Sequence, residues 1–200
     1  HPKIKNFLRY LKDLGHIANL TINQGHLRAY QELIRELIQE KLVHGVGISI
    51  TSKNYDFLCP LLEMTDNIVY HVIAGVNKPS VIDELMKLGK AKILVLGYKK
   101  FGFGIEFHKE QIDKVIKEWY TAISSYLGKC VLSFDNLAIE QLNIKRLFTD
   151  EGWNNFYMGD DFVHSMYIDA VKQEYAPTSR SNKRVSFKSK SLLEFFKDKS

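Results

Sequence analysis

The feature that most constrains this sequence is a regular alternation between short apolar runs and longer segments with helical periodicity. The short runs suit strands, and they occupy residues 17–22, 46–50, 68–74, 93–96 and 130–134. In the segments between them, apolar residues recur every three to four positions, as in amphipathic helices. Strands that alternate with helices form parallel sheets with right-handed crossovers. The sequence therefore predicts an α/β protein built from βαβ units.

The predicted strands read as apolar on both faces, which favours a sheet covered by helices on each side. Five strands are too few to close an eight-stranded barrel. The sheet is then open, doubly wound, or completed by strands from elsewhere. A dinucleotide-binding fold is poorly supported, because Gly102 and Gly104 lack the third glycine of the Gly-x-Gly-x-x-Gly motif and the helix that it opens.

The alternation ends near residue 148, so we expect one domain over residues 1–148 and a small α+β extension over 149–200. In the extension, residues 149–153 suit a helix cap and first turn, 166–175 alternates like a strand or one arm of a hairpin, and 191–199 favours a short helix. Much of the net charge of +5 falls within residues 180–190. This basic stretch would contact nucleic acid or an acidic partner, or lie along the surface as a solvated tail.

Polar residues follow the predicted strands, at the edge of a parallel sheet where ligands bind. The candidates there are Thr21, Asn23, Gln24, Ser49, Thr51, Ser52, His71, Gly75, Gly97, Tyr98, Lys99, Ser133, Asp135 and Asn136. Their hydroxyl, amide and imidazole groups suit hydrogen bonding to ribose, amino-acid and adenine groups. Each also has a structural interpretation: Asp135 and Asn136 suit a helix N-cap, His71 suits an interior position, and Gly97 suits a turn.

Metal, disulfide and membrane chemistry find little support in the sequence. Cys59 and Cys130 are far apart and form no zinc or CxxC spacing, and the histidines are scattered. Two thiols without a disulfide framework indicate a reducing compartment, so we expect a cytoplasmic protein. No apolar run approaches the ~20 residues that span a bilayer. Asp160 and Asp161, beside Gly159, suit a turn or would hold a substrate amine.

Several segments, in this order, resemble the radical SAM superfamily. His1-Pro2, a helix, Gly15 and the strand ANLTIN (18–23) are similar to that family's second helix and third strand. Its fourth, fifth and sixth strands resemble GVGISIT (45–51), IVYHVIAGV (68–76) and KILVLGYK (92–99). SFDNLAIEQL (133–142) and NNFYMGDDFVHSMYIDAV (154–171) are similar to phage and bacterial members of unassigned activity. Gln24 is a departure, since it interrupts the family's Thr-Asn-Gly-like run.

The resemblance implies a partial (β/α) barrel of the TIM-barrel type with S-adenosylmethionine (SAM) and a 4Fe–4S cluster as cofactors. By the family's pattern, the SAM pocket would include Asn23, Ser49, Thr51, His71, Gly97 and Tyr98. Substrate would meet Asp135, Asn136, Asp160 and Asp161. The CxxxCxxC loop that binds the cluster is absent, so this chain would be a downstream fragment, inactive alone. The missing barrel segment would belong to the same parent chain or to a separate one.

Two other functions remain open. One is an aldolase-like α/β-barrel enzyme, for which Lys99 is the candidate Schiff-base lysine. The other is a non-enzymatic binding module that uses the basic stretch of residues 180–190. The first residue is His1 rather than Met, which agrees with a processed product or a fragment of a longer protein.

Overall fold

The computed structural model describes residues 1–55, 58–89, 91–160 and 162–197. The chain divides into two compact units, His1–Ile144 (unit 1) and Lys145–Ser200 (unit 2). The division lies close to the boundary expected after residue 148. Each unit is described by itself.

Unit 1 contains a five-stranded parallel sheet whose spatial order follows the chain, β1-β2-β3-β4-β5. The strands are β1 (Asn19–Asn23), β2 (Gly45–Ser49), β3 (Ile68–Ile73), β4 (Lys92–Leu96) and β5 (Val131–Phe134). The expected α/β class with a parallel sheet is confirmed. A doubly wound sheet reverses its strand order at a switch point, and this sheet does not. β1 and β5 are its two edges, so the described strands form no closed barrel.

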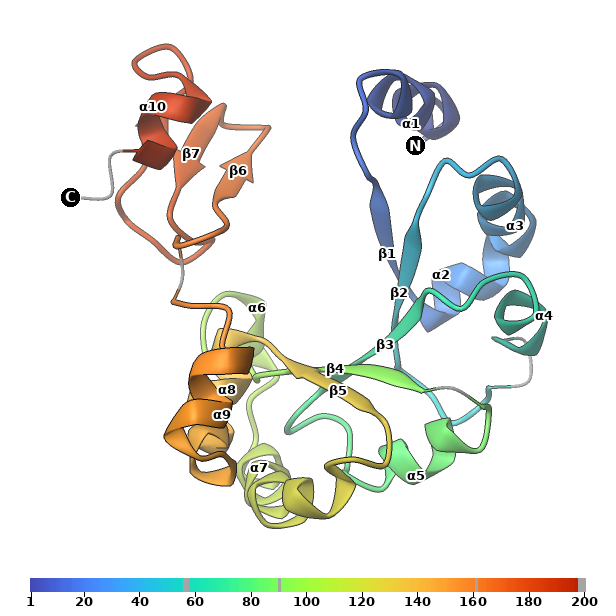
Figure 1. The fold of residues 1–200 in the computed structure, drawn as a ribbon, viewed down its shortest axis with the longest axis vertical. Helices are drawn as coiled ribbons and strands as arrows, with labels where there is room; N and C mark the ends of the chain where they lie inside the picture. Colours follow the sequence, from blue (N-terminus) through green and yellow to red (C-terminus); the bar gives the residue numbers. More distant parts are fainter. Residues whose placement is uncertain (56–57, 90, 161, 198–200) are drawn as a thin grey trace. The chain divides into compact units, whose positions relative to one another are not determined.

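Most helices of unit 1 connect successive strands, whereas the first precedes β1 and the last follows β5. They are α1 (Ile4–Asp13), α2 (Gln24–Ala29), α3 (Gln31–Gln39), α4 (Cys59–Leu62), α5 (Val81–Met86), α6 (Phe103–Glu106), α7 (Glu110–Ala122), the 3-10 turn η2 (Ile123–Tyr126) and α8 (Asn136–Leu142). Figure 1 shows α2, α3, α4, α5 and α7 along the same side of the sheet. All of these connections therefore cover one face.

The two faces of the sheet differ in chemistry. The face under the helices holds the core, and its central side chains, Val46, Ile48, Tyr70, Val72, Ile93 and Val95, are at most 1% exposed. The opposite face, called the open face below, carries the alternate residues, and apart from Gly47 these are half-buried or exposed. It includes Asn19, Thr21, Asn23, Ser49, His71, Lys92 and Ser133. The expectation of strands apolar on both faces holds only in part. On β3 and β4 the open face also carries apolar residues, Val69, Ile73, Leu94 and Leu96, whereas on β1 and β2 polar residues and glycines alternate with the apolar ones.

Two segments that follow strands contain short helices. The run that begins at Asn23 continues directly into α2, because the Asn23 side chain accepts a hydrogen bond from the amide of His26 and caps the helix. The Gly/Phe segment after β4 contains α6. Short side-chain caps and single turns of this kind leave little periodicity in the sequence.

Unit 2 combines a small antiparallel sheet with short helices. Its elements after the 3-10 turn η3 (Ile144–Leu147) are α9 (Asp150–Phe156), β6 (Tyr167–Asp169), β7 (Glu174–Ala176), β8 (Val185–Ser186) and α10 (Leu192–Lys197). The Thr149 hydroxyl caps α9, as expected, by accepting a hydrogen bond from the Gly152 amide at 3.1 Å. β7 is the central strand, and the ring of its Tyr175 stacks on Phe187 and Phe195.

The hairpin expected at residues 166–175 is present, but the segment is not one continuous strand. This segment holds β6, a turn and the start of β7, which pair antiparallel as a hairpin. The Asp169 carboxylate accepts hydrogen bonds from the amides of Val171 and Lys172, and Gln173 adopts a φ of 57°. An aspartate that bonds to amides two and three residues later favours a turn, and this outweighs the alternation of apolar residues.

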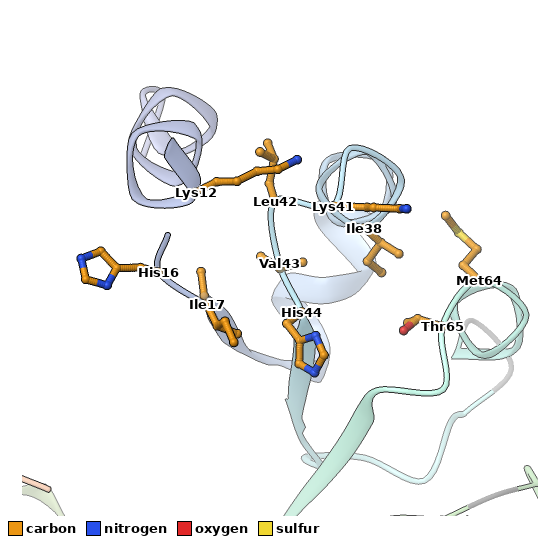
Figure 2. A pocket seen from close by; sticks show the side chains of 11 residues that line it. Lys12, His16, Ile17, Ile38, Lys41, Leu42, Val43, His44, Met64 and Thr65 are labelled. Atoms are coloured by element: carbon orange, nitrogen blue, oxygen red, sulfur yellow. The ribbon is translucent and has the colours of Figure 1, made fainter. Parts of the chain in front are cut away.

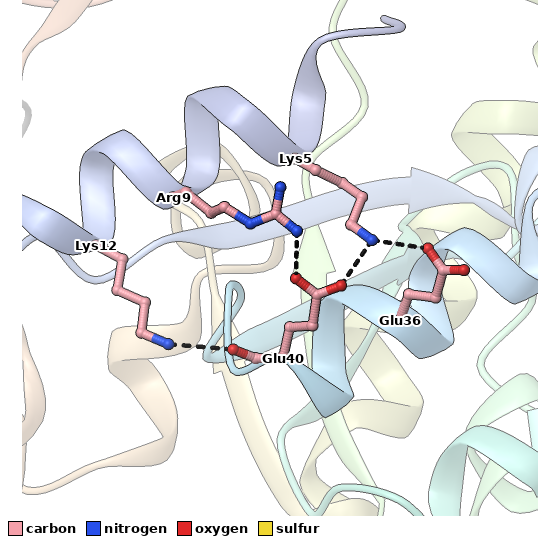
Figure 3. A network of polar contacts seen from close by, with 5 residues as sticks. All are labelled: Lys5, Arg9, Lys12, Glu36 and Glu40. Carbon is pink, nitrogen blue, oxygen red and sulfur yellow. Dashed lines mark hydrogen bonds and ion pairs between the residues drawn. The ribbon is translucent and has the colours of Figure 1, made fainter.

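Helix α1 is joined to α3 by a cluster of ion pairs (Figure 3). Lys5 lies 3.0 Å from the Glu36 carboxylate and 2.6 Å from that of Glu40, and Arg9 lies 2.7 Å from Glu40. The hydrogen bonds that Glu40 accepts from Lys5 and Arg9 lower the pKa of Glu40. The hydrogen bonds that Lys5 donates to Glu40 and Glu36 raise the pKa of Lys5. The contribution of Glu40 to the free energy of unfolding is present above its unfolded pKa and is lost as the pH falls through its lower folded pKa. The contribution of Lys5 is lost as the pH rises through its raised folded pKa.

We therefore expect Glu40→Gln to loosen α1 at neutral pH. Amide hydrogen exchange at Leu8, the buried residue of α1, should lose protection at pH 7. The difference from the unmodified protein should shrink at pH 3 and in ~0.5 M salt, which screens exposed charges. Glu32→Gln is the matched control, because among the described residues Glu32 pairs only with Arg35, within α3. Equal loss of protection in both variants would contradict the role given to Glu40.

The C-terminus of α3 contains a strained residue. Lys41 has a φ of 53°, and its amide bonds to the Ile38 carbonyl while the Leu42 amide bonds to that of Leu37. This is the Schellman pattern, in which the left-handed residue is usually glycine. At the end of α1 the same pattern does use glycine, Gly15, with a φ of 78°.

Lys41→Gly is expected to raise the free energy of unfolding by about 1 kcal/mol, because glycine relieves the left-handed strain. The matched change, Gly15→Ala, should lower it by a similar amount. Urea unfolding followed by circular dichroism measures both. If Lys41→Gly fails to stabilise while Gly15→Ala destabilises, contacts of the Lys41 side chain compensate the strain.

Candidate functional site

The sheet register brings three of the predicted site residues into one line. Asn23 pairs with Ser49, Ser49 pairs with His71, and the line continues through Leu94 to Ser133. These five residues, called the cross-strand row below, lie on the open face near the carboxyl ends of β1, β2 and β3. In parallel α/β sheets this edge is where ligands bind. The row presents an amide, two hydroxyls and an imidazole to one surface.

The imidazole of His71 lies directly over Gly47. A Cβ built on Gly47 would sit 2.6 Å from both Cε1 and Nε2 of His71 and 3.0 Å from Oγ1 of Thr21, so any larger residue would displace this ring. Burial lowers the pKa of His71, because it disfavours the charged form. In the part of the chain that the structure describes, the ring has no hydrogen-bond partner. His71 therefore offers a neutral donor and acceptor to a ligand on the open face.

The side chain of Asn23 is partly used by the fold. Its Oδ1 caps α2 by accepting from the His26 amide at 2.8 Å, and its Nδ2 lies 3.1 Å from Nδ1 of the same histidine. Asn23 is nevertheless exposed. It holds the start of α2 while it borders the open face.

Gln24, a strand-end residue that the predicted SAM pocket did not include, holds the loop after β2. It is 2% exposed, and its Oε1 accepts hydrogen bonds from the amides of Thr51 and Ser52 at 2.9 and 2.8 Å. Its Nε2 donates to the Asn54 carbonyl at 2.6 Å. One buried amide thus holds the loop after β2 in place. The signal in the sequence was the interruption of the Thr-Asn-Gly-like run by a residue able to donate and accept.

Thr51 itself is exposed on that loop, beside a cavity of about 400 Å³ at the carboxyl ends of β2 and β3. Asn77 lines this cavity and connects the two strands, since its Oδ1 accepts from the Ile73 amide and its Nδ2 donates to the Ile50 carbonyl. Across the cavity, Tyr55 donates to Glu84 at 3.0 Å, and burial together with Glu84 raises the pKa of Tyr55 to about 12. The phenol therefore stays protonated at neutral pH.

Gly97, Tyr98 and Asp135 are occupied by contacts within the fold. Oδ1 of Asp135 accepts from the amides of Gly97 at 2.9 Å and Ala138 at 2.7 Å, so it caps α8 and binds the end of β4. The backbone of Tyr98 exchanges two hydrogen bonds with the Gln141 side chain. The Tyr98 hydroxyl donates to the Gly104 carbonyl, and Asn136 is the first residue of α8.

Gly97 could not be replaced without moving α8. A Cβ at this position would lie 2.5 Å from Cγ of Leu137 and 2.7 Å from the backbone nitrogen of Ala138. The glycine thus allows β4 and α8 to approach closely, and that contact fixes the end of β4 next to the cross-strand row.

The remaining predicted residues are the two aspartates of the substrate site, the candidate Schiff-base lysine and the basic stretch, and none of them belongs to the cross-strand row. Asp160 belongs to unit 2, follows α9 and accepts a hydrogen bond from the Tyr157 hydroxyl. Asp161 lies outside the described residues. Lys99 is exposed on the loop after β4, with its Nζ 5.9 Å from the centre of the Phe101 ring. In the basic stretch of unit 2, Arg184 faces Asp169 and Glu174 at 3.7 and 3.8 Å.

No three histidine, cysteine or acidic side chains are grouped to hold a metal ion within residues 1–55, 58–89, 91–160 and 162–197. Cys59 is exposed and Cys130 is half-buried, and both are free thiols. Helices long and apolar enough to cross a membrane are likewise not found in these ranges.

A further cavity of about 410 Å³ lies at the amino ends of β1 and β2. Figure 2 shows Lys12, Lys41 and His44 around it, with Met64 and Thr65 on another wall. The Lys12 ammonium already donates to the Glu40 carbonyl at 3.1 Å. This cavity is at the opposite end of the strands from the edge where ligands of α/β proteins bind.

Comparison of the chain with protein-family models, with curated proteins and with solved structures finds no match. The site is therefore described by its own geometry. It consists of a polar row on an open sheet face, with a neutral imidazole at its centre and a loop positioned by a buried glutamine.

Proposed function

We propose that this chain is the downstream part of a radical SAM enzyme and that its sheet is part of a (β/α) barrel. The observation that carries the proposal is the cross-strand row. Asn23, Ser49 and His71, three of the residues that the family resemblance assigns to the SAM pocket, occupy adjacent positions on neighbouring strands. Sequential parallel strands with their helices on one side also suit a barrel, whose interior face would be the open face.

An incomplete barrel would explain an exposed apolar surface beside the edge strand. β1 pairs with β2 alone among the described strands. On α1, which precedes it, Phe7, Tyr10 and Leu14 are 54–60% exposed at helical spacing. Exposed apolar faces and unpaired edges usually have an occupant. A further βα unit, with its strand against β1 and its helix against α1, would cover both.

The residues present fit SAM better than they fit an iron–sulfur cluster. Asn23, Ser49 and His71 would hydrogen-bond the ribose or the amino-acid group, and the Thr51 loop held by Gln24 would border the same ligand. The two free thiols, Cys59 and Cys130, lie in different βα units and do not fit a cluster that needs three neighbouring cysteines. The cluster, which supplies the reductive chemistry of the family, would be held by a segment outside residues 1–200.

The test is anaerobic production of 5′-deoxyadenosine from SAM and dithionite. The gene product that includes the segment encoded upstream should yield it after cluster reconstitution, and residues 1–200 alone should not. His71→Ala should reduce the yield at least about tenfold, whereas His16→Ala, a change at an exposed histidine, should not. An upstream sequence without a cysteine triplet, in a product that forms no deoxyadenosine, would remove the proposal.

A further inference from the structure

The open face contains a cavity that extends from the cross-strand row, where His71, Leu94 and Ser133 line it, toward the amino ends of the strands. Its volume is about 310 Å³, which is at the lower end of the range for small-molecule sites. Gly45 and Gly47 form part of its floor, so no side chain of β2 fills it there. Glycine within a strand often marks the close approach of a ligand or another backbone. The space is thus suited to a small metabolite.

The polar groups around this cavity are basic or neutral. They include Lys92, His44, His71, Asn67, Thr21 and Ser133, and no described residue that lines the cavity is acidic. A cation without a counterion in a half-buried site is costly. The cavity therefore favours a ligand that brings negative charge.

Lys92 is held in position to meet such a ligand. It is the first residue of β4, is half-buried, and donates to Oδ1 of Asn67 at 3.1 Å. Nδ2 of Asn67 lies 3.4 Å from Nε2 of His44, which orients the amide so that its oxygen faces the lysine. Lys92 makes no ion pair with a described residue. Two of the three N–H groups of its ammonium are left for a ligand.

We propose that this cavity binds a small oxyanion, a phosphate or carboxylate group, with Lys92 as its charged contact. The hydroxyls of Thr21 and Ser133 and the imidazole of His71 surround the same space and add neutral hydrogen bonds. The binding site stands on the cavity alone.

The experiment is an NMR titration of residues 1–200, with the amides of Gly45 and Gly47 as reporters. Inorganic phosphate and succinate are the two anionic probes, and glycerol is the uncharged control. Saturable shifts at these glycines are expected with at least one anion and not with glycerol. Stronger binding of phosphate or of succinate identifies the class of group. Absence of saturable shifts with both anions overturns the proposal.

Two variants locate the site. Lys92→Met should weaken binding at least about tenfold, the effect of losing a charged hydrogen bond. Asn67→Asp keeps the size of the side chain and adds a carboxylate beside Lys92, so it should also abolish binding. Lys41→Met, in the other basic cavity, should leave the affinity unchanged. Binding lost in Lys41→Met, or retained in both Lys92→Met and Asn67→Asp, contradicts the proposal.

The outcome is separable from that of the proposed function. A gene product that does not cleave SAM, in a protein whose phosphate or succinate binding depends on Lys92, removes the radical SAM assignment and leaves the oxyanion site. A gene product that cleaves SAM, in a protein that shows no Lys92-dependent binding of phosphate or succinate, removes the oxyanion site alone.

Discussion

Replacing Trp119 with alanine is expected to lower the free energy of unfolding by about 4 kcal/mol, the usual cost of removing a fully buried aromatic side chain. Trp119 lies on α7 and is 0% exposed. Its indole Nε1 donates to the Asn77 carbonyl at 2.7 Å. The substitution would leave both a cavity and an acceptor without its donor. Because Asn77 connects the ends of β2 and β3, the carboxyl edge of the sheet should also loosen.

Urea unfolding followed by far-ultraviolet circular dichroism measures this effect. The control is Trp153→Ala at the other tryptophan of the chain, which is half-buried in unit 2 and stacks on Tyr157. Its loss should cost about 1 kcal/mol. Equal costs for the two variants would show that Trp119 does not hold the sheet edge. Hydrogen exchange at Ile73, whose amide bonds to Asn77, should increase only in Trp119→Ala.

The second large effect is expected for Gln24→Met, which keeps the shape of the side chain and removes its hydrogen bonds. The amides of Thr51 and Ser52 would lose their shared acceptor, and the Asn54 carbonyl would lose its donor. Each unsatisfied buried group costs about 1–3 kcal/mol, and water would replace part of the loss because this loop is near the surface. We expect a total of about 2–3 kcal/mol.

Two measurements separate a local from a global effect. Urea unfolding gives the change in stability, and amide exchange at Thr51 and Ser52 should rise far more than exchange in β5. Gln39→Met, at an exposed position of α3, is the matched control and should change neither. If Gln24→Met leaves the exchange of the Thr51 loop unaltered, the loop is held by other contacts, and Gln24 is not a positioning residue for the site.

Local periodicity identified the regular elements of unit 1 well. The segments predicted as strands each contain most of the corresponding strand, because burial of one sheet face selects apolar residues over a few consecutive positions. The prediction was poorer where single side chains decided the backbone. The cap by Asn23, the turn made by Asp169 and the short helix α6 each depend on one or two local contacts that leave no repeated pattern.

The sequence by itself determined that this chain forms parallel βαβ units and that polar residues lie at the ends of its strands. The tertiary structure alone decided which of them meet. Asn23, Ser49 and His71 share a row only because of the register between three strands, and a shift of one residue would turn a strand's side chains to the other face. The pairing of Lys92 with Asn67 and the span of Gln24 to the β2 loop are also contacts between residues at least 25 positions apart. Such contacts follow from packing of the whole sheet, because no local pattern specifies them.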